Sequence, residues 1–213
     1  MRVVYLHGFA SSPQSSKAQF FARKFSEAGV SFEAPALDGG DFEKLTITGQ
    51  LEVVGRAVER ARSEPGEVTL MGSSLGGYLA ALYAGQHPTQ VGKLILLAPA
   101  FHFLERWRKR LRPEEFDAWQ RQGWAPIYHF GAKREMRLGR QFLEDGATYP
   151  AEPEFPQPAL ILHGRSDPVV PYEVSSQYAL AHPRARLVPL DSGHELTDVL
   201  DALWAATAEF LWN

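Results

Sequence analysis

The chain alternates between short apolar runs and longer segments in which apolar residues recur every three or four positions. The short runs predict buried strands at residues 2–7, 30–34, 68–71, 91–97, 159–163 and 185–190. The longer segments predict helices at residues 13–28, 45–62, 78–86, 172–181 and 197–211. Strands and helices that alternate in this way predict an α/β fold with a mostly parallel, doubly wound sheet of about six strands.

Residues 98–157 interrupt this alternation and are rich in Arg, Trp and Glu. We expect this segment to form a small cap, inserted above the carboxyl edge of the sheet within a single domain of residues 1–213. Its pattern predicts two helices, a hairpin and a further short helix, at 103–111, 113–122, 127–136 and 138–145.

A basic run at residues 106–112 falls on the first predicted helix of the cap. The simplest interpretation is the solvated side of that helix. The alternative is a site for an anionic part of a substrate, such as the phosphates of coenzyme A.

The strongest local signal lies at residues 68–78, Val-Thr-Leu-Met-Gly-Ser-Ser-Leu-Gly-Gly-Tyr. An apolar strand leads into a Gly-x-Ser-x-Gly turn, and a helical segment follows at once, which is the context of a nucleophile elbow. Ser74 is then expected on an exposed, strained corner at the carboxyl end of the sheet. Gly72 and Gly76 leave room for the neighbouring backbone at that corner.

Two further loops supply candidate partners for Ser74. In a doubly wound sheet, functional residues collect in the loops that leave the carboxyl ends of strands. His194 follows the last predicted strand, and Asp167 follows the strand before it. The order Ser74, Asp167, His194 is the one expected of a triad on this fold. Asp191 and Asp198 are the rival candidates for the acid.

Each of the three candidate residues has a specific chemical role. A serine hydroxyl is a weak nucleophile at neutral pH, so His194 must take its proton and later deliver it to the leaving group. Asp167 should accept a hydrogen bond from the other ring nitrogen of His194 and fix its tautomer. We expect the backbone N–H groups of Leu75 and Phe9 to bind the oxyanion.

Three other histidines lie near the expected site. His7 is expected to support the oxyanion loop rather than to take part in chemistry. We expect His163 to be a hydrogen-bonded histidine at a strand end. His102 follows the predicted strand at 91–97 and is a candidate for lining the pocket.

At this point the sequence resembles a known family. Residues 4–13, Val-Tyr-Leu-His-Gly-Phe-Ala-Ser-Ser-Pro, with Lys17-Ala18, and residues 71–78 are similar to the YqiA-type small esterases of the α/β-hydrolase superfamily. The resemblance implies a cofactor-free serine hydrolase that acts on esters, with acyl-CoA thioesters as a further possibility. It also implies a minimal fold that starts at the strand bearing His7-Gly8.

Composition narrows the function further. The chain has no cysteine, which excludes disulfides and thiolate chemistry, and its net charge of −3 gives no case for nucleic acid or a membrane as partner. His194-Glu195-Leu196-Thr197-Asp198 lacks the second histidine of a zinc motif, so we expect no metal and no cofactor. The apolar run at the start is too short for a signal peptide or membrane span, and we expect a cytoplasmic protein.

The sequence therefore predicts a serine carboxylic-ester hydrolase that acts on short- to medium-chain acyl esters through an acyl-enzyme. Its partner would be a small-molecule ester, and the sequence leaves the oligomeric state open. An acyl-CoA thioesterase is the enzymatic alternative, and a ligand-binding receptor without turnover is the alternative from a different class.

Overall fold

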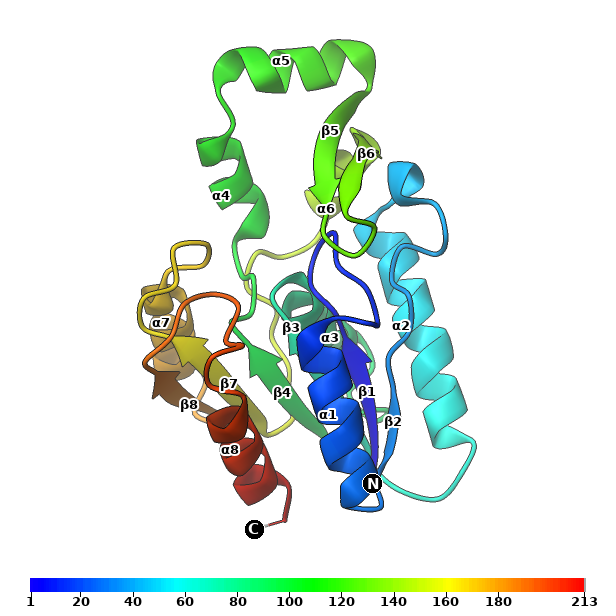
Figure 1. Ribbon diagram of the computed structural model, residues 1–213, viewed down its shortest axis with the longest axis vertical. Helices are drawn as coiled ribbons and strands as arrows, with labels where there is room; N and C mark the ends of the chain where they lie inside the picture. Colours follow the sequence, from blue (N-terminus) through cyan, green and yellow to red (C-terminus); the bar gives the residue numbers. More distant parts are fainter. Residues whose placement is uncertain (213) are drawn as a thin grey trace.

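The computed structural model describes residues 1–212 and contains a central six-stranded sheet with the order β2-β1-β3-β4-β7-β8 (Figure 1). All neighbouring strands of this sheet run parallel, which confirms the predicted fold class. Its strands are β1 (Arg2–Leu6), β2 (Ser31–Glu33), β3 (Val68–Ser73), β4 (Lys93–Leu97), β7 (Ala159–Gly164) and β8 (Ala185–Leu190).

The central strands are buried on both faces. Every residue of β3 and β7 is buried, as expected of parallel strands that helices cover on both sides. Side chains that alternate along β1 enter two separate hydrophobic clusters, with Val4 and Leu6 in one and Val3 and Tyr5 in the other. The sheet is therefore the middle layer of three.

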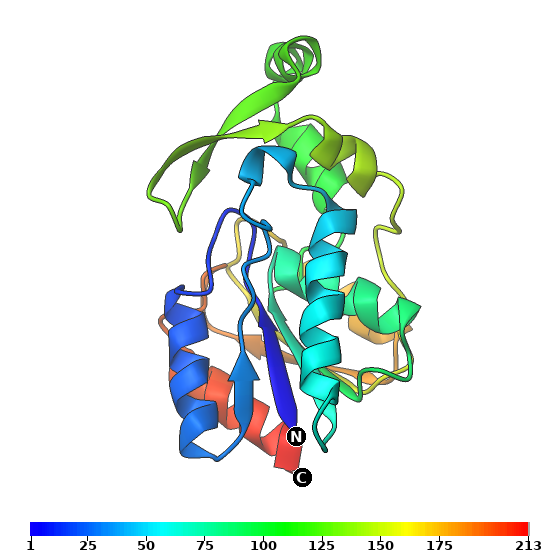
Figure 2. The ribbon, with the colours of Figure 1, turned by 90° about the vertical axis from the view of Figure 1, so that its right-hand side faces the viewer.

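Helices form the two outer layers (Figure 2). One face of the sheet packs against α1 (Ser16–Glu27) and α8 (Leu200–Trp212), and the other against α2 (Ile47–Arg62), α3 (Leu75–Gln86) and α7 (Tyr172–Ala181). The helix α2 continues through Gly49 and Gly55 despite their low helix propensity, because its buried side packs on the sheet.

Two helices begin later than their periodicity predicts. The side chain of Ser15 accepts a hydrogen bond from the backbone N–H of Ala18, which caps α1 at Ser16 rather than at residue 13. The helix α8 begins at Leu200 rather than at residue 197. Ser192 donates a side-chain hydrogen bond to Asp198, which holds the preceding residues in a turn.

The segment between β4 and β7 forms the cap, which lies beyond the carboxyl ends of the strands (Figure 1). Its hairpin is longer than predicted and pairs Trp124 with Gly139 at its open end. Because β6 includes the buried Leu138, the last cap helix begins at Gln141 rather than at residue 138. The cap elements are α4 (Phe103–Arg110), α5 (Pro113–Gln122), β5 (Trp124–His129), β6 (Arg134–Gly139) and α6 (Gln141–Gly146).

The N-terminus of α3 lies directly on the ends of β1 and β3. A Cβ atom on Gly76 would overlap the carbonyl oxygens of Leu6 and His7, and one on Gly72 would overlap the carbonyl of Gly76. These are backbone atoms of the sheet and of the turn itself, so they cannot move aside as a flexible side chain could. Glycine at these two positions is therefore what lets the helix start so close to the sheet.

This packing predicts opposite outcomes for two glycine substitutions. We expect Gly76→Ala to lower the free energy of unfolding by about 1–3 kcal/mol or more, because the added methyl overlaps the backbone of β1. Gly55→Ala in α2 is the matched control. Its methyl would meet Tyr83 Cε2 at an ordinary 3.6 Å, so helix propensity should leave the protein equally stable or stabilise it by up to about 1 kcal/mol.

Urea unfolding followed by circular dichroism measures both values. Equal stability of the two variants would contradict the close approach of α3 to β1.

Candidate active site

Ser74 occupies a strained corner between β3 and α3. Its backbone has φ 54° and ψ −116°, a conformation that residues with a side chain rarely adopt. The corner is held by hydrogen bonds on both sides, since Ser74 N–H donates to the carbonyl of Leu97 at 2.8 Å and Ser74 C=O accepts from Gly77 N–H at 2.9 Å. The sheet and the first turn of α3 therefore fix the direction in which the Ser74 side chain points.

The structure brings Ser74, His194 and Asp167 into one hydrogen-bonded chain. His194 Nε2 lies 3.0 Å from Ser74 Oγ, and His194 Nδ1 lies 2.7 Å from Asp167 Oδ2. The three residues come from the loops after β3, β8 and β7, which end at the same edge of the sheet. The rival carboxylates Asp191 and Asp198 do not contact the His194 ring in the described part of the chain.

Asp167 is held as a buried carboxylate. Its Oδ1 accepts hydrogen bonds from the backbone N–H groups of Val169 at 2.7 Å and Val170 at 2.8 Å. Burial alone would raise the pKa of Asp167, but the hydrogen bonds from His163, His194 and Val170 together outweigh it and hold that pKa below its usual range. A carboxylate only accepts hydrogen bonds, so His194 carries a proton on Nδ1, and its Nε2 faces the hydroxyl of Ser74.

His163 is a second histidine on the same carboxylate. It is fully buried, and its Nε2 lies 3.2 Å from Asp167 Oδ2 and 2.9 Å from the carbonyl of Val170. Both neighbours accept hydrogen bonds, so Nε2 is the protonated nitrogen, and Nδ1 meets the hydroxyl of Ser175 at 2.7 Å. The sequence predicted a hydrogen-bonded strand-end histidine here but gave no sign of its contact with Asp167.

A buried lysine anchors the loop that carries His194. Lys17 in α1 donates a hydrogen bond from Nζ to the carbonyl oxygen of Glu195, the residue after His194. Burial lowers the pKa of Lys17, while the carboxylates of Glu195 and Asp167 act in the opposite direction. Sequence reasoning missed this role, because the partner is a backbone carbonyl far along the chain.

The two predicted oxyanion donors, Phe9 and Leu75, both line the cavity at Ser74. Neither backbone N–H donates a hydrogen bond to another atom of residues 1–212. His7 supports the first of these loops, since its Nδ1 lies 2.9 Å from the carbonyl of Gly8 and its Nε2 accepts from Leu37 N–H at 3.2 Å. Burial lowers the pKa of His7, so its ring is a neutral structural bridge.

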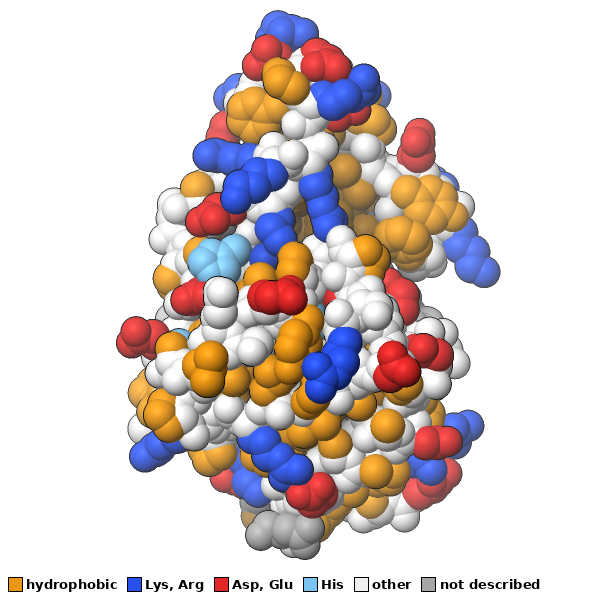
Figure 3. Space-filling model, turned by 90° about the vertical axis from the view of Figure 1, so that its left-hand side faces the viewer, with side chains coloured by type: hydrophobic (Ala, Val, Ile, Leu, Met, Phe, Trp, Pro, Cys, Tyr) orange, Lys and Arg blue, Asp and Glu red, His pale blue; other side chains and the backbone are white. Residues whose placement is uncertain are grey.

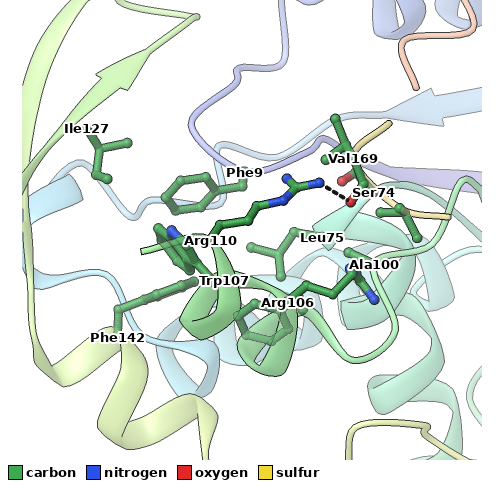
Figure 4. Close-up of a pocket in the computed structure, with 12 residues that line it drawn as sticks. Phe9, Ser74, Leu75, Ala100, Arg106, Trp107, Arg110, Ile127, Phe142 and Val169 are labelled. Atoms are coloured by element: carbon green, nitrogen blue, oxygen red, sulfur yellow. Dashed lines mark hydrogen bonds between the residues drawn. The ribbon is translucent and has the colours of Figure 1, made fainter. Parts of the chain in front are cut away.

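A cavity of about 280 Å³ opens between the cap and the sheet edge, directly over Ser74 (Figure 4). Its walls are mainly apolar. They come from the core at Phe9, Leu75, Ala100, Val169 and Val170, and from the cap at Phe103, Trp107, Ile127 and Phe142. Two cap arginines, Arg106 and Arg110, are its only charged lining residues in the described chain. The basic run is thus only partly the solvated face that the sequence predicted.

His102 does not reach this cavity. Its ring makes a 2.7 Å contact with the carboxylate of Glu152 and lines a separate hollow beneath the cap. Residues 1–212 contain no group of three or more His, Asp or Glu side chains placed to hold a metal ion. None of their helices is long and apolar enough to cross a membrane.

These features define the class of protein. A parallel six-stranded sheet, helices on both faces and a serine at the corner between β3 and α3 make this an α/β-hydrolase fold. The model of the family described as uncharacterised protein family UPF0227 matches residues 2–211. The chain belongs to this family, and its resemblance to the YqiA-type small esterases is confirmed.

The chain is similar to solved structures over nearly its whole length and to curated proteins over about half of it. A protein described as a hydrolase of the alpha/beta superfamily from Xanthomonas campestris pv. campestris is 27% identical, with a TM-score of 0.66 over 99% of this chain and 97% of its own. Est1E from Butyrivibrio proteoclasticus, solved with ferulic acid bound, is 21% identical, with a TM-score of 0.85 over 99% of this chain and 88% of its own.

Among curated proteins, monoacylglycerol lipase abhd6-A from Xenopus laevis is 30% identical over 103 residues. The match covers 46% of this chain and 30% of the lipase, so the matched part spans about a third of that relative's length.

The pKa of Asp167 predicts an acid dependence of stability. Since this pKa is lowered in the folded state, the carboxylate stabilises the fold above the pKa of a free Asp, about 4, and the stabilisation is lost as the pH falls below that value. Asp167→Asn should therefore weaken the fall in the free energy of unfolding between about pH 5 and pH 2.5. Asp191→Asn, at an exposed position in the His194 loop, should keep the wild-type slope. A wild-type slope in Asp167→Asn would contradict the account of this carboxylate.

Proposed function

We propose that this protein is a serine carboxylic-ester hydrolase that acts on short- to medium-chain acyl esters through an acyl-enzyme on Ser74. The proposal rests on one observation above all. Ser74, His194 and Asp167 form a hydrogen-bonded chain, with contacts of 3.0 and 2.7 Å, and Ser74 lines a mainly apolar cavity. The tautomer that Asp167 imposes on His194 is the one that a general base requires.

In the first half of the reaction, Ser74 Oγ attacks the carbonyl carbon of the ester while its proton moves to His194 Nε2. The electron pair of the carbonyl bond moves to oxygen, and the N–H groups of Phe9 and Leu75 bind the resulting oxyanion. Both groups line the cavity and lack an acceptor among residues 1–212, which supports this role.

His194 then returns the proton to the oxygen of the leaving alcohol as the bond between carbonyl carbon and that oxygen breaks. The acyl group remains on Ser74. In the second half, His194 takes a proton from water, the hydroxide attacks the acyl carbon, and the acid leaves as His194 reprotonates Ser74. Asp167 stays ionised throughout and stabilises the imidazolium.

The walls of the cavity support the choice of acyl length. Aromatic side chains from core and cap pack against one another, with Phe9 and Trp107 ring centroids 5.0 Å apart and Trp107 and Phe142 centroids 5.5 Å apart. A cavity of about 280 Å³ is at the small end of ligand pockets, so it limits how many methylenes can be buried. The names of the lipase relative and of the esterase neighbour are consistent with ester chemistry.

Hydrolysis of p-nitrophenyl butyrate tests the proposal. Because the three residues act as a unit, Ser74→Ala and His194→Ala should each lower kcat by at least about 10⁴-fold. The double variant should lose little more than either single one. Losses that add in the double variant, or full activity in Ser74→Ala, would show that the chemistry takes place elsewhere.

The same assay, run from acetate to palmitate, tests the acyl length. Each buried methylene contributes about 0.8 kcal/mol, or about fourfold in kcat/KM, until the cavity is full. We therefore expect kcat/KM to rise from acetate to a short or medium chain and then to fall. A value that still rises at palmitate would contradict the small size of the cavity.

A further inference from the structure

Two arginines of the cap face the cavity that contains Ser74. Arg106 and Arg110 lie four residues apart on α4, so their side chains share one side of the helix. Both line the cavity beneath the cap, where Arg110 extends across to Val169 and Arg106 points toward Ala100 (Figure 4). Hydrolysis of a neutral ester, as proposed above, does not require these positive charges.

Neither arginine has an acidic partner. No carboxylate of residues 1–212 lies within 4.0 Å of either guanidinium, whereas Arg112, just beyond the helix, pairs with both Glu114 and Glu115. Arg106 donates to the carbonyl of Phe101, and Arg110 donates from Nη2 to the carbonyls of Pro168 at 2.7 Å and Val169 at 2.9 Å. A guanidinium has five N–H groups, so both retain donors for a ligand.

The surroundings of Arg106 make its positive charge unfavourable. Burial and, second to it, the neighbouring charge of Arg110 lower the pKa of Arg106 to about 10, against weaker opposite effects of Asp167 and Glu105. Arg106 therefore remains protonated at neutral pH beside apolar walls. A positive charge that is partly removed from water and unpaired is stabilised when an anion binds it.

The surface view agrees with this placement. Lys and Arg side chains gather around the hollow between the cap and the core of the fold (Figure 3). Ser74 and both arginines line the same cavity of about 280 Å³, so an anion bound there lies close to the reacting ester. The phosphates of coenzyme A are separated from its thioester by a long pantetheine arm, so a ligand of that length does not fit this small space.

We propose that the substrate is a small ester that carries its own anionic group, a carboxylate or a phosphate, which Arg106 and Arg110 bind while the ester carbonyl reaches Ser74. The inference rests on the proposed esterase function and deepens it by naming the substrate class. Arg106 and Arg110 act as specificity residues, and the bonds made and broken at Ser74 are unchanged.

Matched ester pairs test this inference. On the alcohol side, 4-acetoxybenzoate and 4-acetoxyphenyl phosphate are compared with methyl 4-acetoxybenzoate. On the acyl side, p-nitrophenyl hydrogen adipate is compared with p-nitrophenyl hexanoate. Rates are corrected for spontaneous hydrolysis. We expect at least one anionic ester to exceed its neutral partner about tenfold or more in kcat/KM, and the better of carboxylate and phosphate identifies the anion.

Variants then connect the preference to the two arginines. Arg106→Gln and Arg110→Gln should each lower the ratio of anionic to neutral kcat/KM by about 10- to 100-fold, since each removes a hydrogen-bonded charge. Arg106→Lys should retain part of it. Lys109→Gln is the matched control, because Lys109 is exposed on the same helix and does not line the cavity. That variant should keep the wild-type ratio.

A measurement on the wild type alone keeps the inference testable if a variant fails to fold. Benzoate and phenyl phosphate should inhibit hydrolysis of p-nitrophenyl butyrate at concentrations about tenfold below those of benzamide. Equal inhibition, or no anionic preference in either ester pair, would overturn the inference while leaving the esterase function intact. Higher kcat/KM for acyl-CoA than for every small ester would also overturn it. Failure to hydrolyse any ester would instead remove the proposed function itself.

Discussion

The close approach of α3 to the ends of β1 and β3 is the constraint on which the site depends. Gly72 and Gly76 have no side chains at the two points where backbone meets backbone, and the turn between them forces Ser74 to φ 54°. The same approach brings the loop after β1 against the corner, so that Phe9 and Leu75 both line the cavity. The strain at Ser74 is offset by the packing of a helix that is buried over most of its length.

A second constraint concerns charge. Asp167 is a carboxylate only 7% exposed, which is tolerable because two backbone N–H groups and two histidines hydrogen-bond it. His163 approaches this carboxylate from β7, and Lys17 holds the loop of His194 from α1. Elements from both layers of helices and from the sheet thus position a single imidazole opposite Ser74.

The sequence predicted much of the fold because strands buried on both faces and amphipathic helices leave strong periodic signals. It also favoured Asp167 over Asp191, because Asp191 lies only three residues before His194 in the same loop and is awkwardly placed to hold the His194 ring. The contact of Lys17 with the carbonyl of Glu195 left no such signal, since a backbone acceptor has no sequence identity. The sequence also did not predict which side of α4 faces the cavity. Helical periodicity cannot distinguish an arginine exposed to solvent from one that lines a pocket, as Arg106 does.

The core of the fold and the cap contribute different residues to the site. The core supplies Ser74, its hydrogen-bonded partners and the lining residues Phe9 and Leu75, while the cap supplies further walls and the two positive charges. The central claim is that the residue at the strained corner is a nucleophile activated by His194. Treatment with a fluorophosphonate, followed by peptide mass spectrometry, tests it most directly. The account predicts one adduct per chain on Ser74, with much slower labelling in His194→Ala and none in Ser74→Ala. An adduct on another residue, or none in the wild type, would contradict it.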